Sequence, residues 1–224
     1  MSWPTFAVIF GLFFVTHSVP VRPSVKARLQ RHIGQTGFTV AYSFLSLIML
    51  TALIWAAQNA PYLQLWPQAS WHRYVVFFGM FFVCVIAALA IGRPNPFSFG
   101  GARNDDYDPA TPGIVRISRH PLLASIALWA GLHLLPNGDL AHAILFGVFL
   151  SFAVLGRWII DQRKRRLMGP SEWHALLHKT RQSPLLQTPA NRIGLAVRIG
   201  IATGVFGLLM VLHPILIGAS PLPV

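Results

Sequence analysis

Long apolar segments constrain the fold of this chain more than any other feature. Five lie at about residues 4–19, 37–57, 74–92, 120–135 and 140–160, and a sixth, at 193–217, is interrupted by Arg198 and His213-Pro214. A helix needs about 20 residues to cross the ~30 Å hydrocarbon core of a bilayer. These runs do not alternate as barrel strands do. With 54% hydrophobic and 11% charged residues, the chain is predicted to be an all-α membrane protein. We expect a bundle of six transmembrane helices with short loops, or five if the last segment does not cross.

The apolar segments also suggest how the chain is organised. We expect a transmembrane domain of five spans at residues 1–190, and a C-terminal transmembrane helix at 191–224 packed on the same bundle. The first span is expected to be retained, because no cation precedes it and several follow. Residues 93–111 predict a structured cytoplasmic loop, and 171–180 an amphipathic helix at the membrane surface with Ser171 as its N-cap. The single cysteine, Cys84, excludes an intrachain disulfide.

The net charge of +12 follows the loops between spans. Lys and Arg gather after the first, third and fifth segments, whereas the loops after the second and fourth contribute only Arg73. Excess cations mark the cytoplasmic side, so we expect a multi-pass protein of the bacterial inner membrane with both termini periplasmic. Anionic lipid head groups are the expected counterions. A nucleic-acid partner is not expected, because no basic soluble module is present.

Histidines are the main candidates for chemistry. By the predicted topology, His17 and His120 lie on the cytoplasmic side, and His133 and His213 in the outer half. His133 follows His120 by thirteen residues, which is ~20 Å along a helix. Two axial ligands of one iron are only ~4 Å apart, so His120 and His133 cannot share a metal. His17 with His120, or His133 with His213, could.

Paired imidazoles in a helical bundle favour haem b, with His17 and His120 as candidate iron ligands. Arg116 and Arg119 would then suit the haem propionates, helped by the N-terminus of the fourth span. His133 and His213 are the secondary candidates. The alternative is that these histidines only form hydrogen bonds to neighbouring helices, and that the arginines only set topology.

The few acidic residues give little support for catalysis. Asp139 is expected to cap the fifth span, and Asp161 to orient the cations at 163–166 or to cap the end of that span. No carboxylate lies in the middle of a predicted span, so a proton or cation transporter would lack its usual relay. The sequence also contains no glycine-rich phosphate loop, zinc-protease motif or convincing serine triad.

In combination, several motifs over residues 1–190 resemble the NnrU family of bacterial inner-membrane proteins. They are His17-Ser18, GRPNPFSF at 92–99, GIVRISRHP at 113–121, LWAGLHLLPNGD at 128–139, LFG at 145–147, and DQRKRR at 161–166 followed by Gly169 and Trp173. The resemblance implies an accessory role in denitrification, linked to nitrite and nitric oxide reduction, with reductase components as expected partners. It implies no agreed molecular activity.

Two related groups imply alternatives. The 15-cis-zeta-carotene isomerases, haem enzymes of the membrane, have His-Ser and Arg-His-Pro elements similar to His17-Ser18 and to residues 119–121. That resemblance implies haem, with His17 as the most transferable ligand, and an isomerase-like enzyme acting on a lipid-soluble substrate. The isoprenylcysteine carboxyl methyltransferases are also similar, but they have a paired-glutamate motif where this chain has Asp161-Gln162-Arg163. This departure makes methyl transfer the weaker alternative.

Overall fold

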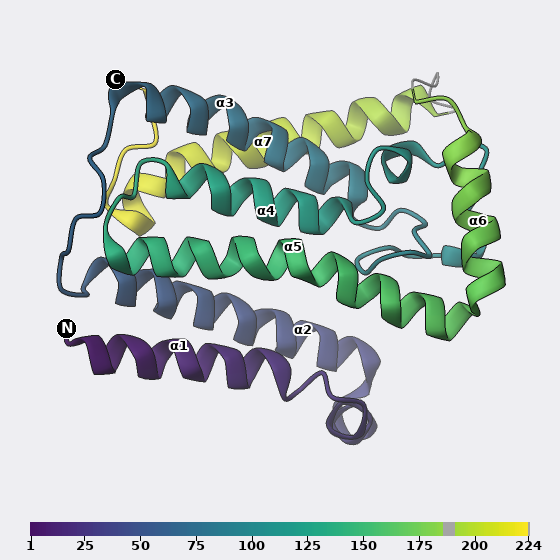
Figure 1. The fold of residues 1–224 in the computed structure, drawn as a ribbon, viewed down its shortest axis with the longest axis horizontal. Helices are drawn as coiled ribbons and strands as arrows, with labels where there is room; N and C mark the ends of the chain where they lie inside the picture. The colour runs from purple at the N-terminus through teal and green to yellow at the C-terminus, as the bar shows by residue number, and fades with distance from the viewer. Residues whose placement is uncertain (186–190, 224) are drawn as a thin grey trace. The chain divides into compact units, whose positions relative to one another are not determined.

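The computed structural model describes residues 1–185 and 191–223 and is built from helices. Over these residues no strand forms beyond one isolated bridge between Gln64 and Asp139, which confirms the all-α prediction. Figure 1 shows the main helices: α1 (Trp3–Ser18), α2 (Pro23–Gln58), α3 (Ser70–Ala90), α4 (Pro121–Leu134), α5 (Leu140–Met168), α6 (Pro170–Gln182) and α7 (Arg192–Ile217). Two short 3-10 helices, η1 (Asn104–Asp106) and η2 (Gly113–Arg116), lie before α4.

All six predicted apolar segments fold as helices, but their lengths differ. In the described residues, α2, α3, α5 and α7 are long and apolar enough to cross a membrane. The apolar helices α1 and α4 have 16 and 14 residues, which is less than the ~20 needed to cross the hydrocarbon core alone. The fourth segment was predicted from residue 120, but its helix begins at Pro121, because proline fits the first helical position. His120 therefore precedes the helix.

The chain divides into two compact units. The first comprises residues 1–66 with 138–145. In it α1 packs on α2, and the buried side chains of the two helices include Phe6, Phe10, Phe13 and Phe38. Gly34, at φ +74°, interrupts α2. The backbone of the 63–66 segment meets the start of α5, where Leu65 N–H donates to Gly138 O at 2.7 Å and Leu140 N–H donates to Leu63 O at 2.9 Å. A side chain at Gly138 would collide with the Trp66 carbonyl.

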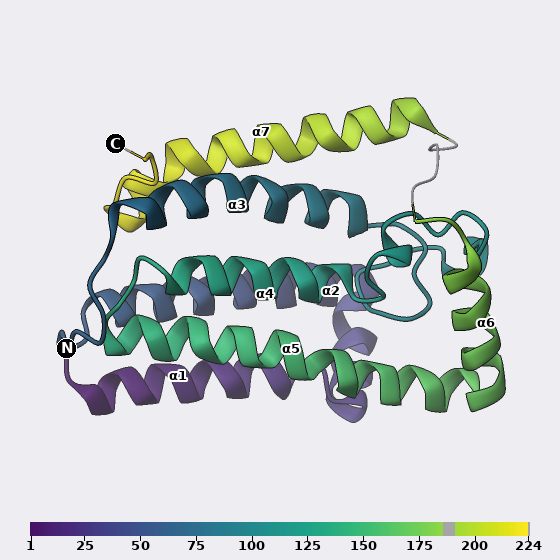
Figure 2. The same cartoon turned by 45° about the horizontal axis from the view of Figure 1, so that its top comes forward.

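The second unit comprises residues 67–137 and 146–224, described to residue 223. Here α3 packs against both α4 and α7, as Figure 2 shows. The contact is a cluster of buried and partly buried apolar side chains: Met80, Val83, Leu132, Trp129 and Phe206. Arg198 of α7 donates hydrogen bonds to the carbonyls of Ala88 and Ile91 at the end of α3. The Arg198 guanidinium therefore has two backbone acceptors in the second unit.

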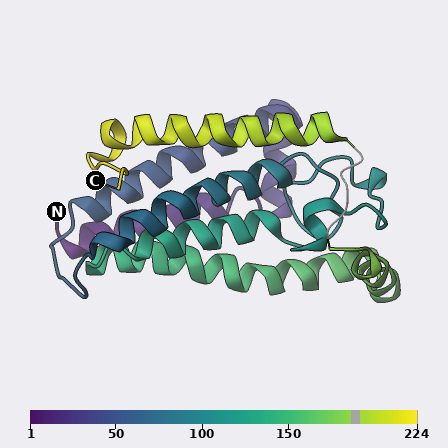
Figure 3. The same ribbon diagram turned by 90° about the horizontal axis from the view of Figure 1, so that it is seen from above.

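The amphipathic helix α6 turns away from the direction of α5, as Figure 3 shows. Its Trp173 and Leu177 are buried against Phe97 and Val115 of the loops before α4. The predicted N-cap at Ser171 is wrong: Gly169, at φ +93°, occupies that position and Pro170 begins the helix. Glycine adopts this backbone conformation readily, and proline suits the first helical turn.

Candidate functional site

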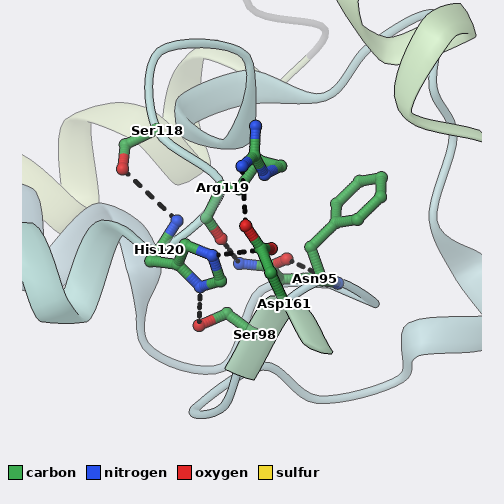
Figure 4. Close-up of polar contacts among 7 residues, drawn as sticks. Asn95, Ser98, Ser118, Arg119, His120 and Asp161 are labelled. Atoms are coloured by element: carbon green, nitrogen blue, oxygen red, sulfur yellow. Dashed lines mark hydrogen bonds and ion pairs between the residues drawn. The ribbon is translucent and has the colours of Figure 1, made fainter. Parts of the chain in front are cut away.

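A buried polar network surrounds His120, just before α4. The Nδ1 atom of its ring lies 3.0 Å from Ser98 Oγ, and Nε2 lies 3.0 Å from Asp161 Oδ1 (Figure 4). Ser98 comes from the loop after α3, and Asp161 from α5. His120 and Ser98 are each 2% exposed. Residues 98, 120 and 161 are therefore joined through one imidazole ring.

Arg119 strengthens this network. Its Nη2 donates to Asp161 Oδ2 at 2.7 Å. The Asn95 amide donates to Arg119 O at 3.0 Å, and the Asn95 amide oxygen accepts from Phe97 N–H at 3.1 Å. The prediction that Asp161 orients the cations at 163–166, or caps α5, is wrong. Its carboxylate instead binds the residues that enter α4, because they offer a guanidinium and an imidazole that carry complementary donors.

The partners of His120 assign its tautomer. Burial lowers the pKa of His120, opposed by the neighbouring Asp161 carboxylate, so the neutral ring is favoured. A carboxylate only accepts hydrogen bonds, and His120 Nε2–H therefore donates to Asp161, while the Ser98 hydroxyl donates to Nδ1. Both ring nitrogens are occupied. A metal ion could bind His120 only by displacing Ser98 or Asp161.

Ser98, His120 and Asp161 form a chain of two hydrogen bonds, from serine through histidine to a carboxylate, that the sequence did not predict. The three residues are separated by 22 and 41 positions, and no local motif connects them. A catalytic serine must meet its substrate, but the Ser98 hydroxyl is buried. In this conformation the array can hold a proton and fix the loops. Asn95 was also missed, although the run of Pro and Asn at 94–96 indicated a turn.

Arg116 lies apart from this network. Its Nε donates to Ser183 O at 2.7 Å, which ties η2 to the residue after α6. The predicted role of Arg116 and Arg119 at haem propionates stays a prediction. In this structure each guanidinium already has a protein acceptor.

His17 belongs to the first unit, whereas His120 belongs to the second. The His17 ring is exposed and stacks on Phe13 with centroids 5.2 Å apart, and its Nδ1 lies 3.5 Å from Ser46 Oγ. The Tyr42 hydroxyl donates to His17 O at 2.9 Å. The pairing of His17 with His120 stays a prediction.

His133 and His213 both belong to the second unit. His133 Nδ1 donates to Trp129 O at 2.9 Å, and the ring lies 5.1 Å from that of Phe146. His213 Nδ1 donates to Ala219 O at 2.7 Å. Both residues lie toward the C-terminal ends of their helices, α4 and α7, which finish at the same end of the second unit (Figure 1). Within the described part of the chain, neither Nε2 atom has a hydrogen-bond partner, so each keeps a lone pair.

The donor chemistry of this outer pair fits a metal better than that of His120. Metal-binding histidines commonly donate one ring N–H to a backbone carbonyl, and this fixes the other nitrogen for the metal. No group of three metal-binding side chains lies together in residues 1–185 and 191–223. Two histidines, however, would suffice to hold a haem iron.

At the start of α3, a pocket of about 350 Å³ opens between that helix and the C-terminal residues. Its lining consists of Gln68, Ala69, Ser70, Arg73, Tyr74 and Pro223. Figure 1 shows the start of α3 at the same end of the second unit as the C-terminal ends of α4 and α7. The pocket therefore places one arginine at the end of the unit that carries His133 and His213.

Comparison with known proteins gives a match at the level of the family. The sequence model described as "NnrU protein" matches residues 5–221. The match includes the last apolar helix, beyond the 190 residues over which the motifs resemble that family. No curated protein and no solved structure matches the chain.

Proposed function

This chain belongs to the NnrU family of membrane proteins, and we propose that it is a haem-binding accessory protein that supports the reduction of nitrite and nitric oxide. Its place would be the bacterial inner membrane, with both termini periplasmic, since the loops after the odd-numbered apolar segments carry the cations. The role in denitrification is supported by the resemblance to the family.

The observation that carries haem binding is the state of the two outer histidines. His133 and His213 each donate one ring N–H to a carbonyl and keep the other nitrogen without a protein partner. They are the residues that would hold the iron, and Arg73 is a cation at the same end of the unit that could meet a propionate. A bound haem would supply one-electron chemistry. The protein would fix the imidazoles through Trp129 O and Ala219 O and surround His133 with aromatic rings.

A second candidate is an isomerase-like haem enzyme acting on a lipid-soluble substrate. The packing of His133 against Trp129 and Phe146 favours it, because an apolar environment suits such a substrate. Genes for nitrite or nitric oxide reductases next to this one would support the accessory role. Genes for carotenoid or prenyl-lipid enzymes would support the isomerase.

The visible spectrum of the protein purified from haem-replete cells tests the proposal. We expect a Soret band that His133→Ala and His213→Ala each shift or abolish, because either change would remove a residue proposed to hold the iron. His120→Ala and the control His174→Ala, in the exposed part of α6, should leave the band unchanged.

Loss of the band in His17→Ala and His120→Ala, but not in His133→Ala, would move the site to the inner pair. A purified protein without any Soret band would refute haem binding. The accessory role is tested separately, by deleting the gene and measuring nitrite and nitric oxide during anaerobic growth on nitrate. Unchanged reduction of both would contradict it.

A further inference from the structure

Two hydrogen-bond donors remain unused beside the His120 network. Among the described residues, Arg119 Nε and Trp173 Nε1 are buried side-chain donors without any hydrogen-bond partner. Trp173 is 6% exposed. A buried donor without an acceptor is costly, and in folded proteins such groups usually have a water, an ion or a ligand as their partner.

The two side chains that carry these donors lie next to each other. The Arg119 guanidinium lies over the Trp173 ring, with its central carbon 5.8 Å from the ring centroid. Arg119 comes from the segment before α4, and Trp173 from α6. The guanidinium is held by Asp161, and the indole is held by its edge-to-face contact with Phe97. Both donors are therefore fixed before any ligand arrives.

The charge around these donors selects the ligand. Arg157 acts electrostatically on His120 together with Arg119. Asp161 supplies the opposing carboxylate, and both of its oxygens already have partners. Among the groups that act on His120, two arginines face one carboxylate, and the unused groups beside it are donors only. An oxyanion meets both conditions.

We propose that Arg119 and Trp173 form a binding site for a phosphate oxyanion at the end of the second unit that carries α6. The phosphate belongs either to an anionic lipid head group or to a free phosphate. The amphipathic character of α6 is compatible with the lipid source, because such helices lie at the membrane surface. This site is separate from the two histidines proposed to hold haem.

The test compares phosphate binding by the detergent-purified protein and its variants, measured as the rise in unfolding temperature. Sodium phosphate is compared with sodium chloride at equal ionic strength, and dioleoyl phosphatidylglycerol with dioleoylglycerol, which lacks the phosphate. Stabilisation by sodium phosphate assigns a free phosphate. Stabilisation by the phospholipid alone assigns a lipid head group.

Trp173→Phe keeps the aromatic ring but removes the N–H. We expect it to lower the affinity for whichever probe stabilises the wild type about tenfold, as for the loss of one hydrogen bond to a charged group. Arg119→Lys should weaken it similarly while retaining a charge for Asp161. The matched controls are Trp158→Phe, on an exposed face of α5, and Arg163→Lys, which is also exposed. Neither control should change binding.

Equal binding by wild type, Trp173→Phe and Arg119→Lys would overturn the proposal. So would the absence of stabilisation by both probes, which would leave a water as the partner of these donors. If Trp173→Phe does not fold, Arg119→Lys decides the question with the same two probes.

Discussion

The two ends of α4 carry histidines in opposite chemical states. His120, before the helix, uses both ring nitrogens, for Ser98 and Asp161. His133, in the last turn, uses one nitrogen for Trp129 O and keeps the other free of described partners. The two residues therefore differ in how many ring nitrogens are already bound, and only His133 keeps a nitrogen for the proposed metal.

The largest effect is expected from Asp161, the acceptor for His120. Asp161→Asn keeps the shape but removes the charge, and leaves Arg119 without its counterion. We expect a loss of about 3 kcal/mol, at the low end for a broken buried ion pair because both partners remain partly exposed. The measurement is denaturant unfolding in detergent, with Asp106→Asn, in the exposed η1, as the control. Equal stability of both variants would show that the network does not hold α4 to α5.

A smaller effect is expected from pH. Burial holds the pKa of His120 below its ordinary value of 6.5, against the pull of Asp161 and with the help of Arg119 and Arg157. Below that value the unfolded chain gains a proton on this residue before the folded protein does, so stability falls as the pH decreases from 6.5. The unfolding temperature should decrease on acidification, and less steeply in His120→Gln. The same slope in both proteins would refute the neutral state of His120.

The smallest change in stability is expected at the other end of α4. His133→Phe keeps an aromatic ring between Trp129 and Phe146, so we expect a loss below about 1 kcal/mol, as in volume-conserving substitutions. The Soret band should nevertheless disappear. If His133→Phe keeps the Soret band but is strongly destabilised, His133 is the structural residue and the contrast with His120 is wrong.

The helices were predictable from sequence because transfer into lipid is set by the composition of each segment. Local rules also predicted that Asp139 caps α5, and its carboxylate accepts from His142 N–H at 3.1 Å. The role of Asp161 was missed for the opposite reason. Its cationic neighbours in sequence suggested local pairing, whereas its partners come from residues 41 and 42 positions earlier.

The state of the histidines could be predicted only in part. Spacing along the fourth segment correctly separated His120 from His133, because helical rise fixes the distance between them. It gave no information on which ring nitrogens are free. Ser98 becomes the partner of His120, and Ala219 that of His213, only when the chain folds. Ser171 was predicted as an N-cap from residue type, but the neighbouring Gly169-Pro170 pair starts α6 instead.

Contacts at both ends also fix the rotational phase of α5 against α4. The Phe146 ring lies 5.4 Å from Trp129 near one end, and Asp161 binds Arg119 and His120 at the other. Each residue of a helix is rotated by ~100° from the preceding one. Inserting or deleting a single residue between Phe146 and Asp161 would therefore turn the carboxylate away from its partners, however conservative the added side chain. Over this interval, natural variation should take the form of substitutions at constant length.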